Sequence, residues 1–332
     1  MRAVIAWFLL CICWPSAAGA PMPVTIALPG PGTLPYLPID LMPKIGADKS
    51  EGVQVTLRHF GGGPLVIKDM MSGNSDFAAL GFSALAETAG IEGKAYALAS
   101  LVQVPAYTLM VSSRMKSKVK SPADLRGRSI GVHSGSKGGK STGQHITEFL
   151  LGRAGVSPQD VNFISAGQNY KAYSAALLSG AADAIITNEP SATRLEAAGI
   201  AYRLVDLHDP TATRKYFGSL FQYTQLCART DVIQHQTDKV NRVMAALISS
   251  LKWIQKHNAR EVAERMGIQD QEERDTFIRA LEKHRAMFSP DGVFSAEALA
   301  GTAALIKAVH EGEHEGPGLE RLINDQWVGS RQ

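Results

Sequence analysis

Two short stretches of the chain, "MMSGNSDFAALGFS" at residues 70–83 and "LLSGAADAIITNEP" at residues 177–190, follow one pattern. Each reads as the end of a helix, a Ser-Gly turn, an Asp, and an apolar run of strand length. Glycine often follows the last helical residue because it adopts positive φ without steric cost, and an Asp can accept hydrogen bonds from turn N–H groups. The pattern predicts two copies of one helix–strand unit.

The residues that precede each copy extend the repeat. In the first half an apolar strand at 24–28 leads into a Gly-rich turn, then a second strand at 51–57 and a helix at 65–71. In the second half a strand at 129–132 is followed by a Gly/Ser-rich turn and a helix at 144–153, and the order continues in the same way. Alternating strands and helices predict an α/β fold with mainly parallel sheets, here in two similar lobes.

Two extended apolar stretches, at 102–115 and 217–230, are predicted to cross between the lobes as a two-stranded hinge. We therefore assign residues 22–106 and 222–312 to lobe 1 and residues 112–217 to lobe 2. The crossings fall at 107–111 and 218–221, and residues 313–332 form a C-terminal tail. After the second crossing, apolar residues recur at helical spacing and predict one long helix with a buried stripe, made of Val240, Val243, Met244, Leu247, Ile248, Leu251 and Ile254.

The first twenty residues have the layout of a secretory signal peptide: Arg2, an apolar run from 3 to 14, and a small-residue segment. Cleavage fits after Ala18 or after Ala20. Neither cysteine of this segment follows a small residue as a lipid-attachment site requires, so we expect a periplasmic protein without a lipid anchor. The remaining cysteine, Cys227, then has no partner for an internal disulfide. A membrane anchor is the alternative interpretation of this segment.

Composition and motifs argue against several functions. The 34 Lys and Arg against 31 Asp and Glu give a net charge of +3 without basic clusters, which does not indicate nucleic-acid binding. "GSKGGKST" at 135–142 lacks the first Gly of a phosphate-binding P-loop, and the "HEGEH" at 310–314 is interrupted by Gly where a zinc protease needs a continuous helix. "SGSK" at 134–137 lacks the companion motifs of an acyl enzyme. We expect no catalytic residue, no metal and no cofactor.

What remains is binding chemistry. In parallel sheets, ligands lie beyond the carboxyl ends of strands, where turns lead into helix N-termini with free N–H groups. Applied to this sequence, that rule selects ligand-binding candidates in six turns: Gly32, Thr33, Leu34, Tyr36, Gly62, Gly63, Gly81, Phe82, Ser83, Ser134, Ser136, Ser141, Asn169, Tyr170, Asn188 and Glu189. Backbone N–H groups would hold a polar end and the aromatic rings an apolar part. For Glu189 three roles stay open: repelling an anion, binding a cationic group, or a latch between the lobes.

The phrases "VTIALPGPGTLPYLPI", "EGVQVTLRHFGGG", "ADLRGRSIGVHSGS" and the two repeats, in this order, make the chain resemble the SsuA/THI5-like (NMT1-like) substrate-binding proteins of ABC importers. That resemblance implies the periplasmic binding protein type II fold. It also implies a small-molecule ligand of the sulfonate, nitrate, carboxylate or pyrimidine class, a membrane permease as partner, and a monomer. An enzyme on the same fold, such as a pyrimidine synthase, or an extracytoplasmic sensor are the alternatives, although the cysteine-rich motif of the family's enzymes is absent.

Overall fold

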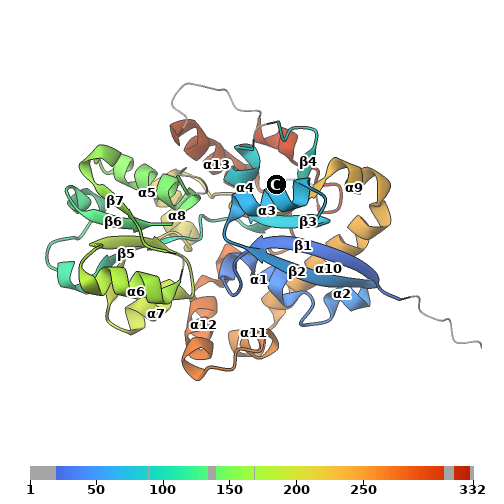
Figure 1. Ribbon diagram of the computed structural model, residues 1–332, viewed down its shortest axis with the longest axis horizontal. Helices are drawn as coiled ribbons and strands as arrows, with labels where there is room; N and C mark the ends of the chain where they lie inside the picture. The colour runs from blue at the N-terminus through green and yellow to red at the C-terminus, as the bar shows by residue number, and fades with distance from the viewer. Residues whose placement is uncertain (1–19, 89, 134–139, 168, 310–317, 330–332) are drawn as a thin grey trace, which may run out of the picture.

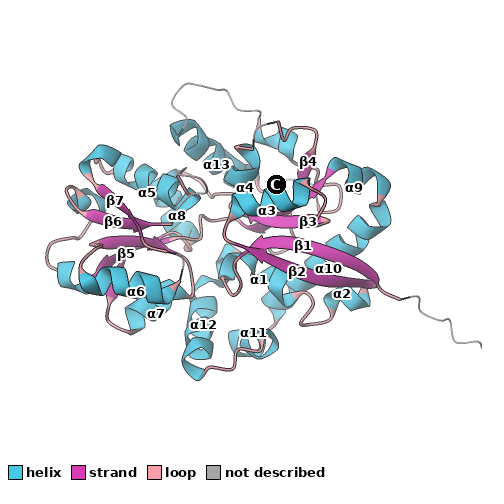
Figure 2. Cartoon of the chain, viewed as in Figure 1, coloured by secondary structure: helices cyan, strands magenta, loops and turns pink. Residues whose placement is uncertain are grey.

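The computed structural model describes residues 20–88, 90–133, 140–167, 169–309 and 318–329, and it places them in two α/β lobes that lie side by side (Figure 1). Each lobe is built on a five-stranded sheet, and helices cover the faces of both sheets (Figure 2). This arrangement confirms the predicted fold class of two similar lobes. Ser134, Ser136 and the "SGSK" and "HEGEH" motifs lie outside the described residues.

The first sheet has the order β2-β1-β3-β10-β4, and all its strands except β10 point the same way. The antiparallel strand β10 comes late in the chain and lies between two early strands. The strands are β1 (Met22–Pro29), β2 (Val53–Phe60), β3 (Phe77–Gly81), β4 (Ala95–Val102) and β10 (Thr224–Arg229).

The second sheet has the order β7-β6-β8-β5-β9, again with a single antiparallel strand, β5. In both sheets the antiparallel strand is the one that follows directly from a crossing between the lobes. The strands are β5 (Thr108–Ser112), β6 (Ser129–Val132), β7 (Asn162–Ser165), β8 (Ala184–Thr187) and β9 (Ala201–Asp206).

The repeated Asp has the same role in both lobes. Asp76 accepts a hydrogen bond from the backbone N–H of Thr25 in β1 at 2.8 Å, and Asp183 accepts one from Ser129 in β6 at 3.2 Å. Each therefore ties the entry of its own strand to the neighbouring parallel strand. Gly73 and Gly180 both have positive φ, 77° and 81°, as the predicted helix ends require.

The helices form near the predicted positions. The long helix α10 (Thr237–Lys256) buries the predicted stripe apart from Ile248, which is half-buried. Ser250 of α10 also donates a hydrogen bond to the carbonyl of Pro38, 2.7 Å away, and so fixes the helix to the first lobe. The remaining helices are α1 (Leu37–Leu41), α2 (Ala47–Ser50), α3 (Gly63–Met71), α4 (Phe82–Ala86), α5 (Thr142–Arg153), α6 (Tyr170–Ser179), α7 (Ser191–Ala197), α8 (Pro210–Phe217), α9 (Thr230–His235), α11 (Ala259–Met266), α12 (Gln271–His284) and α13 (Ala296–Val309).

The chain passes between the sheets at residues 103–107 and 218–223. The first crossing lies a few residues earlier than the expected 107–111. It ends at Tyr107 because β5 already pairs with β8 and β9 from Thr108 onward. Two C-terminal helices then contact the second lobe: Glu272 of α12 accepts from Arg194 at 2.9 Å, and Glu297 of α13 accepts from Arg214 at 2.7 Å. The C-terminal segment thus reaches across to the second lobe. In the part of the chain that is described, no helix combines the length and apolar character that a bilayer span needs.

Candidate ligand-binding site

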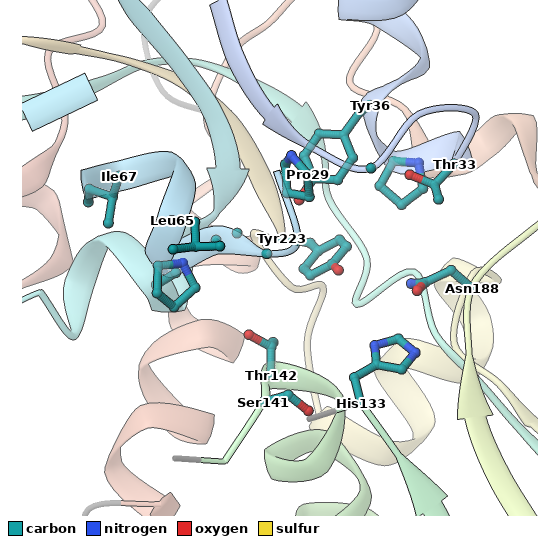
Figure 3. A pocket seen from close by; sticks show the side chains of 18 of the residues that line it. Pro29, Thr33, Tyr36, Leu65, Ile67, His133, Ser141, Thr142, Asn188 and Tyr223 are labelled. Carbon is teal, nitrogen blue, oxygen red and sulfur yellow. The ribbon is translucent and has the colours of Figure 1, made fainter. Parts of the chain in front are cut away.

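A cavity of about 1050 Å³ lies between the two lobes, and residues of both lobes and of both crossings line it. Its first-lobe wall comes from the turns after β1, β2 and β3, and its second-lobe wall from the turns after β6, β7 and β8. The carboxyl ends of both sheets therefore face one space, as the rule for parallel sheets predicts. Figure 3 shows Tyr36, Leu65 and Thr33 from the first lobe opposite His133, Ser141, Thr142 and Asn188 from the second.

Tyrosine rings from the crossings lie at the centre of the cavity. Tyr107 ends the first crossing and Tyr223 the second, and their rings meet edge to face with centroids 5.5 Å apart. Tyr36 lies nearby, and all three side chains are buried. Burial raises the pKa of each of the three phenols, so all three are neutral hydrogen-bonding groups at physiological pH.

On the second-lobe wall, His133 follows β6 and its Nε2 lies 2.6 Å from the hydroxyl of Tyr173 on α6. The two rings also stack, with centroids 5.9 Å apart. Burial lowers the pKa of His133 to about 4, because the charged imidazolium would lose its hydration. The wall therefore presents an uncharged imidazole at neutral pH. Asn188 completes it and donates to the carbonyl of Ala106 in the first crossing at 2.8 Å.

The N-terminus of α5 carries two hydroxyls into the cavity. Ser141 is the N-cap and accepts from the N–H of Gln144 at 3.2 Å, while the Thr142 hydroxyl lies 3.2 Å from that of Ser83 in the first lobe. The next residue has to be small, since a Cβ at Gly143 would lie 3.2 Å from the ring of Tyr107. The glycine lets the helix end approach the crossing closely.

The N-terminus of α3 forms the opposite edge. Gly62 is its N-cap and Gly63 its first residue, where a Cβ would lie 3.1 Å from that of Ala84. Leu65, one turn into the helix, is 48% exposed and lines the cavity. A large apolar side chain exposed at a cavity edge is suited to contact an apolar part of a ligand.

Eight of the sixteen predicted site residues line this cavity: Thr33, Tyr36, Gly62, Gly63, Gly81, Ser141, Asn169 and Asn188. Gly32 and Tyr170 instead line a second cavity of about 830 Å³, which lies beyond the loop at Pro31 and Thr33. There the Tyr170 ring is already covered by the guanidinium of Arg194, whose central carbon lies 4.1 Å from the ring centroid.

The other predicted residues that the structure describes lie away from the cavity surface. Leu34 and Phe82 are fully buried in the core. The N–H of Phe82, which we expected to hold the polar end of a ligand, donates to the carbonyl of Tyr223 at 2.7 Å instead. Ser83 is buried and faces Thr142, and Glu189 is fully buried among charged side chains near the cleft base.

The candidate residues chosen from the sequence did not include Tyr107, Tyr223, His133 or Tyr173, although His133 begins one of the selected turns. Tyr107 and Tyr223 lie in the two stretches that we identified as crossings. Each is an aromatic residue directly before the first residue of the strand that follows its crossing, and this position is the signal that could have found them. His133 directly follows a predicted strand. Tyr173 lies in a predicted helix, where nothing in the sequence separates it from a core residue.

The comparisons with known proteins agree with the fold. Residues 49–261 match the family described as NMT1/THI5 like, and the chain belongs to this family. A protein of Bordetella bronchiseptica RB50 is 26% identical, with 93% of this chain and 96% of that chain covered and a TM-score of 0.76. The alkanesulfonate-binding protein SsuA of Xanthomonas axonopodis pv. citri, solved with bound MOPS, has a TM-score of 0.68 at 17% identity, with coverages of 92% and 99%. The fold is that of the SsuA-like periplasmic binding proteins.

Curated relatives from Brucella abortus and Brucella suis are named only as candidate binding proteins. They are 26% identical over 212 residues, which amount to 61% of this chain. The match spans 58% of the length of each relative.

Proposed function

We propose that this chain is the solute-binding component of an ABC importer, and that it holds one small organic ligand in the cavity between its lobes. The observation that carries the proposal is the cavity itself, because both lobes and both crossings contribute to its wall. A ligand that contacts both lobes binds the closed arrangement more tightly than an open one, and so drives closure. A membrane permease would then recognise the closed, ligand-bound protein. Export to the periplasm and a monomeric state are part of the same proposal.

The chemistry of the wall favours a ligand with a polar or anionic head and an apolar or aromatic body. The rings of Tyr107 and Tyr223 and the side chain of Leu65 offer apolar contact. Hydroxyls of Ser141 and Thr142 at the start of α5, the amide of Asn188, and the positive end of the helix dipole suit a polar head. The structural neighbour solved with bound MOPS is an alkanesulfonate-binding protein, and sulfonates, carboxylates, nitrate and pyrimidines are the classes to test first.

The test is a thermal-shift screen of the purified protein over these four ligand classes, with mass spectrometry of any ligand that copurifies. A specific ligand at a hundredfold excess over its Kd should add about 2.7 kcal/mol to the free energy of unfolding. Tyr107→Phe and Tyr223→Phe each remove one cavity hydroxyl and should weaken binding. Tyr216→Phe, at a partly buried tyrosine outside the cavity lining, is the matched control and should not.

The rival function is an enzyme on the same fold. In that case a ligand incubated with the protein would be recovered chemically changed, whereas a solute-binding protein returns it intact. The proposal fails if no member of the panel raises the melting temperature, or if a ligand that does is turned over.

A further inference from the structure

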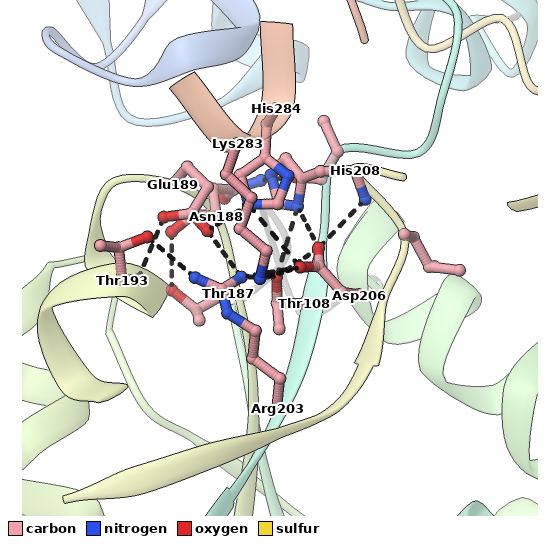
Figure 4. Close-up of polar contacts among 12 residues, drawn as sticks. Thr108, Thr187, Asn188, Glu189, Thr193, Arg203, Asp206, His208, Lys283 and His284 are labelled. Carbon is pink, nitrogen blue, oxygen red and sulfur yellow. Dashed lines mark hydrogen bonds and ion pairs between the residues drawn. The ribbon is translucent and has the colours of Figure 1, made fainter. Parts of the chain in front are cut away.

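Three buried side chains from separate elements meet on the hinge side of the cleft, outside the cavity described above (Figure 4). Glu189 follows β8, His208 follows β9, and His284 ends α12. Glu189 and His208 have no exposed surface and His284 has 2%. Their nearest carboxylate and imidazole atoms all lie within 4.8 Å of one another.

Two imidazole nitrogens of this group, His208 Nε2 and His284 Nε2, have no hydrogen-bond partner among the described residues, whereas Glu189 Oε1 forms an ion pair with Arg203 Nη1 at 2.7 Å. Glu189 Oε1 and His284 Nε2 are 3.1 Å apart, yet not in hydrogen-bond geometry. A buried polar atom without a partner has lost its hydration without compensation, so such atoms are rare in folded proteins. Two such nitrogens beside one buried carboxylate point to a partner other than a protein side chain.

The second carboxylate oxygen of Glu189 and the second ring nitrogen of His208 are held by neighbouring groups. Glu189 Oε2 accepts from the N–H of Thr193 at 3.0 Å. His208 Nδ1 lies 3.2 Å from Asp206 Oδ1 and 3.3 Å from the hydroxyl of Thr108. A carboxylate can only accept, so the Nδ1 atom carries the proton and the lone pair of the neutral ring is on Nε2. A carboxylate behind the imidazole is the usual arrangement for a metal-binding histidine.

We propose that Glu189, His208 and His284 bind one divalent transition-metal ion, with zinc the best match. Zinc takes imidazole nitrogen and carboxylate oxygen at about 2.0–2.2 Å, which separates the ligand atoms of a tetrahedral site by about 3.3 Å. The Glu189 and His284 ligand atoms, 3.1 Å apart, are already near that spacing. Ligand atoms as far apart as 4.8 Å have to come closer by up to about 1.5 Å through side-chain rotation. Asp206 Oδ2, 3.6 Å from His284 Nε2, lies within reach as a fourth ligand.

The charges around the site decide which ions fit. Arg203 Nη1 lies 2.7 Å from Glu189 Oε1 and 3.0 Å from Asp206 Oδ2, and Lys283 Nζ lies 3.2 Å from that same Asp206 oxygen. Glu196 pairs with the other side of Arg203. Three carboxylates thus accompany two cations. A carboxylate oxygen has two lone pairs, so Glu189 Oε1 can contact Arg203 and a metal ion together. Two imidazoles favour zinc over calcium or magnesium, which prefer oxygen ligands throughout.

The site would join parts of the molecule that are far apart in the sequence. Glu189 and His208 extend from strands of the second lobe, whereas His284 belongs to α12 of the C-terminal segment. A bound ion would fix α12 against the second lobe beside the crossings. The expected consequence is structural: the metal stabilises one arrangement of the hinge region and leaves the cavity free for its own ligand.

The test uses the full chain without an affinity tag, stripped with a chelator and then titrated with Zn²⁺ or Co²⁺. We expect one ion per chain, a higher melting temperature with zinc, and the visible absorption of four-coordinate Co²⁺. His208→Gln and His284→Gln should each lower affinity at least tenfold. Asp206→Asn, which removes both the carboxylate behind His208 and the candidate fourth ligand, should lower it by about 10–100-fold or more. His235→Gln, at an exposed histidine elsewhere, is the control and should bind like the wild type.

Two results would overturn the proposal. One is a stripped wild-type protein that takes up no stoichiometric Zn²⁺ or Co²⁺, in which case a buried water satisfies the two imidazole nitrogens. The other is uptake that His208→Gln and His284→Gln leave unchanged. Circular dichroism checks the fold of each variant, and if a variant does not fold, the wild-type titration alone decides.

Discussion

The hydroxyl of Ser83, in α4 of the first lobe, lies 3.2 Å from the hydroxyl of Thr142, the first residue of α5 in the second lobe. This hydrogen bond connects the lobes directly at the cavity, without any contribution from the crossings. It has a counterpart on the backbone, where the N–H of Leu34 donates to the carbonyl of Glu189 at 3.3 Å. The approach of the two lobes is therefore stabilised in part by bonds that a bound ligand does not supply.

Replacing Ser83 by Ala should shift the lobes toward an open arrangement. A buried hydrogen bond between neutral groups contributes about 1 kcal/mol, which corresponds to about a fivefold change in the ratio of closed to open molecules. Single-molecule energy transfer between dyes on the two lobes measures that ratio in the absence of ligand. Thr142→Ser keeps the hydroxyl and is the control. If Ser83→Ala and Thr142→Val shift the ratio additively, the two hydroxyls do not interact and this prediction is wrong.

Gly131 in the middle of β6 should tolerate no side chain. A Cβ there would lie 2.6 Å from the Cβ of Ala166 and 2.8 Å from a methyl group of Ile185, both in the core of the second lobe. Gly131→Ala forces these neighbours apart and should reduce the free energy of unfolding by about 1–3 kcal/mol, measured by urea denaturation. Gly152→Ala is the control, because nothing lies within 4 Å of its Cβ position. It should be neutral or stabilise α5 by up to about 1 kcal/mol.

The sequence predicted the two lobes because their signals are local. Each signal lies within a short stretch of sequence. The glycines that end two helices, Gly73 and Gly180, are followed directly by apolar runs of strand length, and the helical spacing of Val240, Val243 and Leu247 spans only eight residues. Such signals depend on the steric limits of the backbone and on which face of a helix or strand is buried, and residues close in the sequence determine both.

The candidate site was only partly predictable, since its members depend on which way each side chain turns. Phe82 and Tyr223 illustrate the limit: both are aromatic and lie next to a strand end. The ring of Phe82 packs in the buried apolar core of its own lobe, whereas Tyr223 lines the cavity. The grouping of Glu189 with His284 is still harder to predict from the sequence, because the two residues are almost a hundred positions apart and meet only when α12 packs on the second lobe.

Acidification should destabilise the protein through His133. Its pKa is about 4 in the folded protein, where burial disfavours the charged ring, against 6.5 for an unperturbed histidine. The unfolded chain therefore binds a proton that the folded chain does not. Stability is fully present above pH 6.5 and falls as the pH drops toward 4, by at most about 3 kcal/mol.

His133→Gln removes this contribution, so the difference in unfolding free energy between wild type and variant should shrink from pH 7 to pH 5. Urea denaturation at several pH values measures it. His208, which is also buried with a lowered pKa, is present in both proteins and cancels from the difference. Parallel stability profiles of the two proteins would show that His133 takes up its proton equally in the folded and unfolded states.

The second crossing should depend on a single glycine of α13. Thr302 of this helix donates to the carbonyl of Gln222 at 2.9 Å, and the carbonyl of Ala298 accepts from the Gln222 N–H at 2.9 Å. A Cβ at Gly301 would overlap the carbonyl oxygen of Leu220, which belongs to backbone and cannot rotate away. Gly301→Ala must therefore lift α13 from the crossing.

We expect Gly301→Ala to lower the free energy of unfolding by about 1–3 kcal/mol and to speed hydrogen exchange at residues 218–223. The exposed neighbour Ala304 supplies the matched control. Ala304→Gly weakens the same helix by about 1 kcal/mol through backbone entropy, without touching the crossing. It should raise exchange within α13 but not at 218–223. Equal exchange of the crossing in both variants would mean that helix stability, and not the close approach at Gly301, holds the second crossing in place.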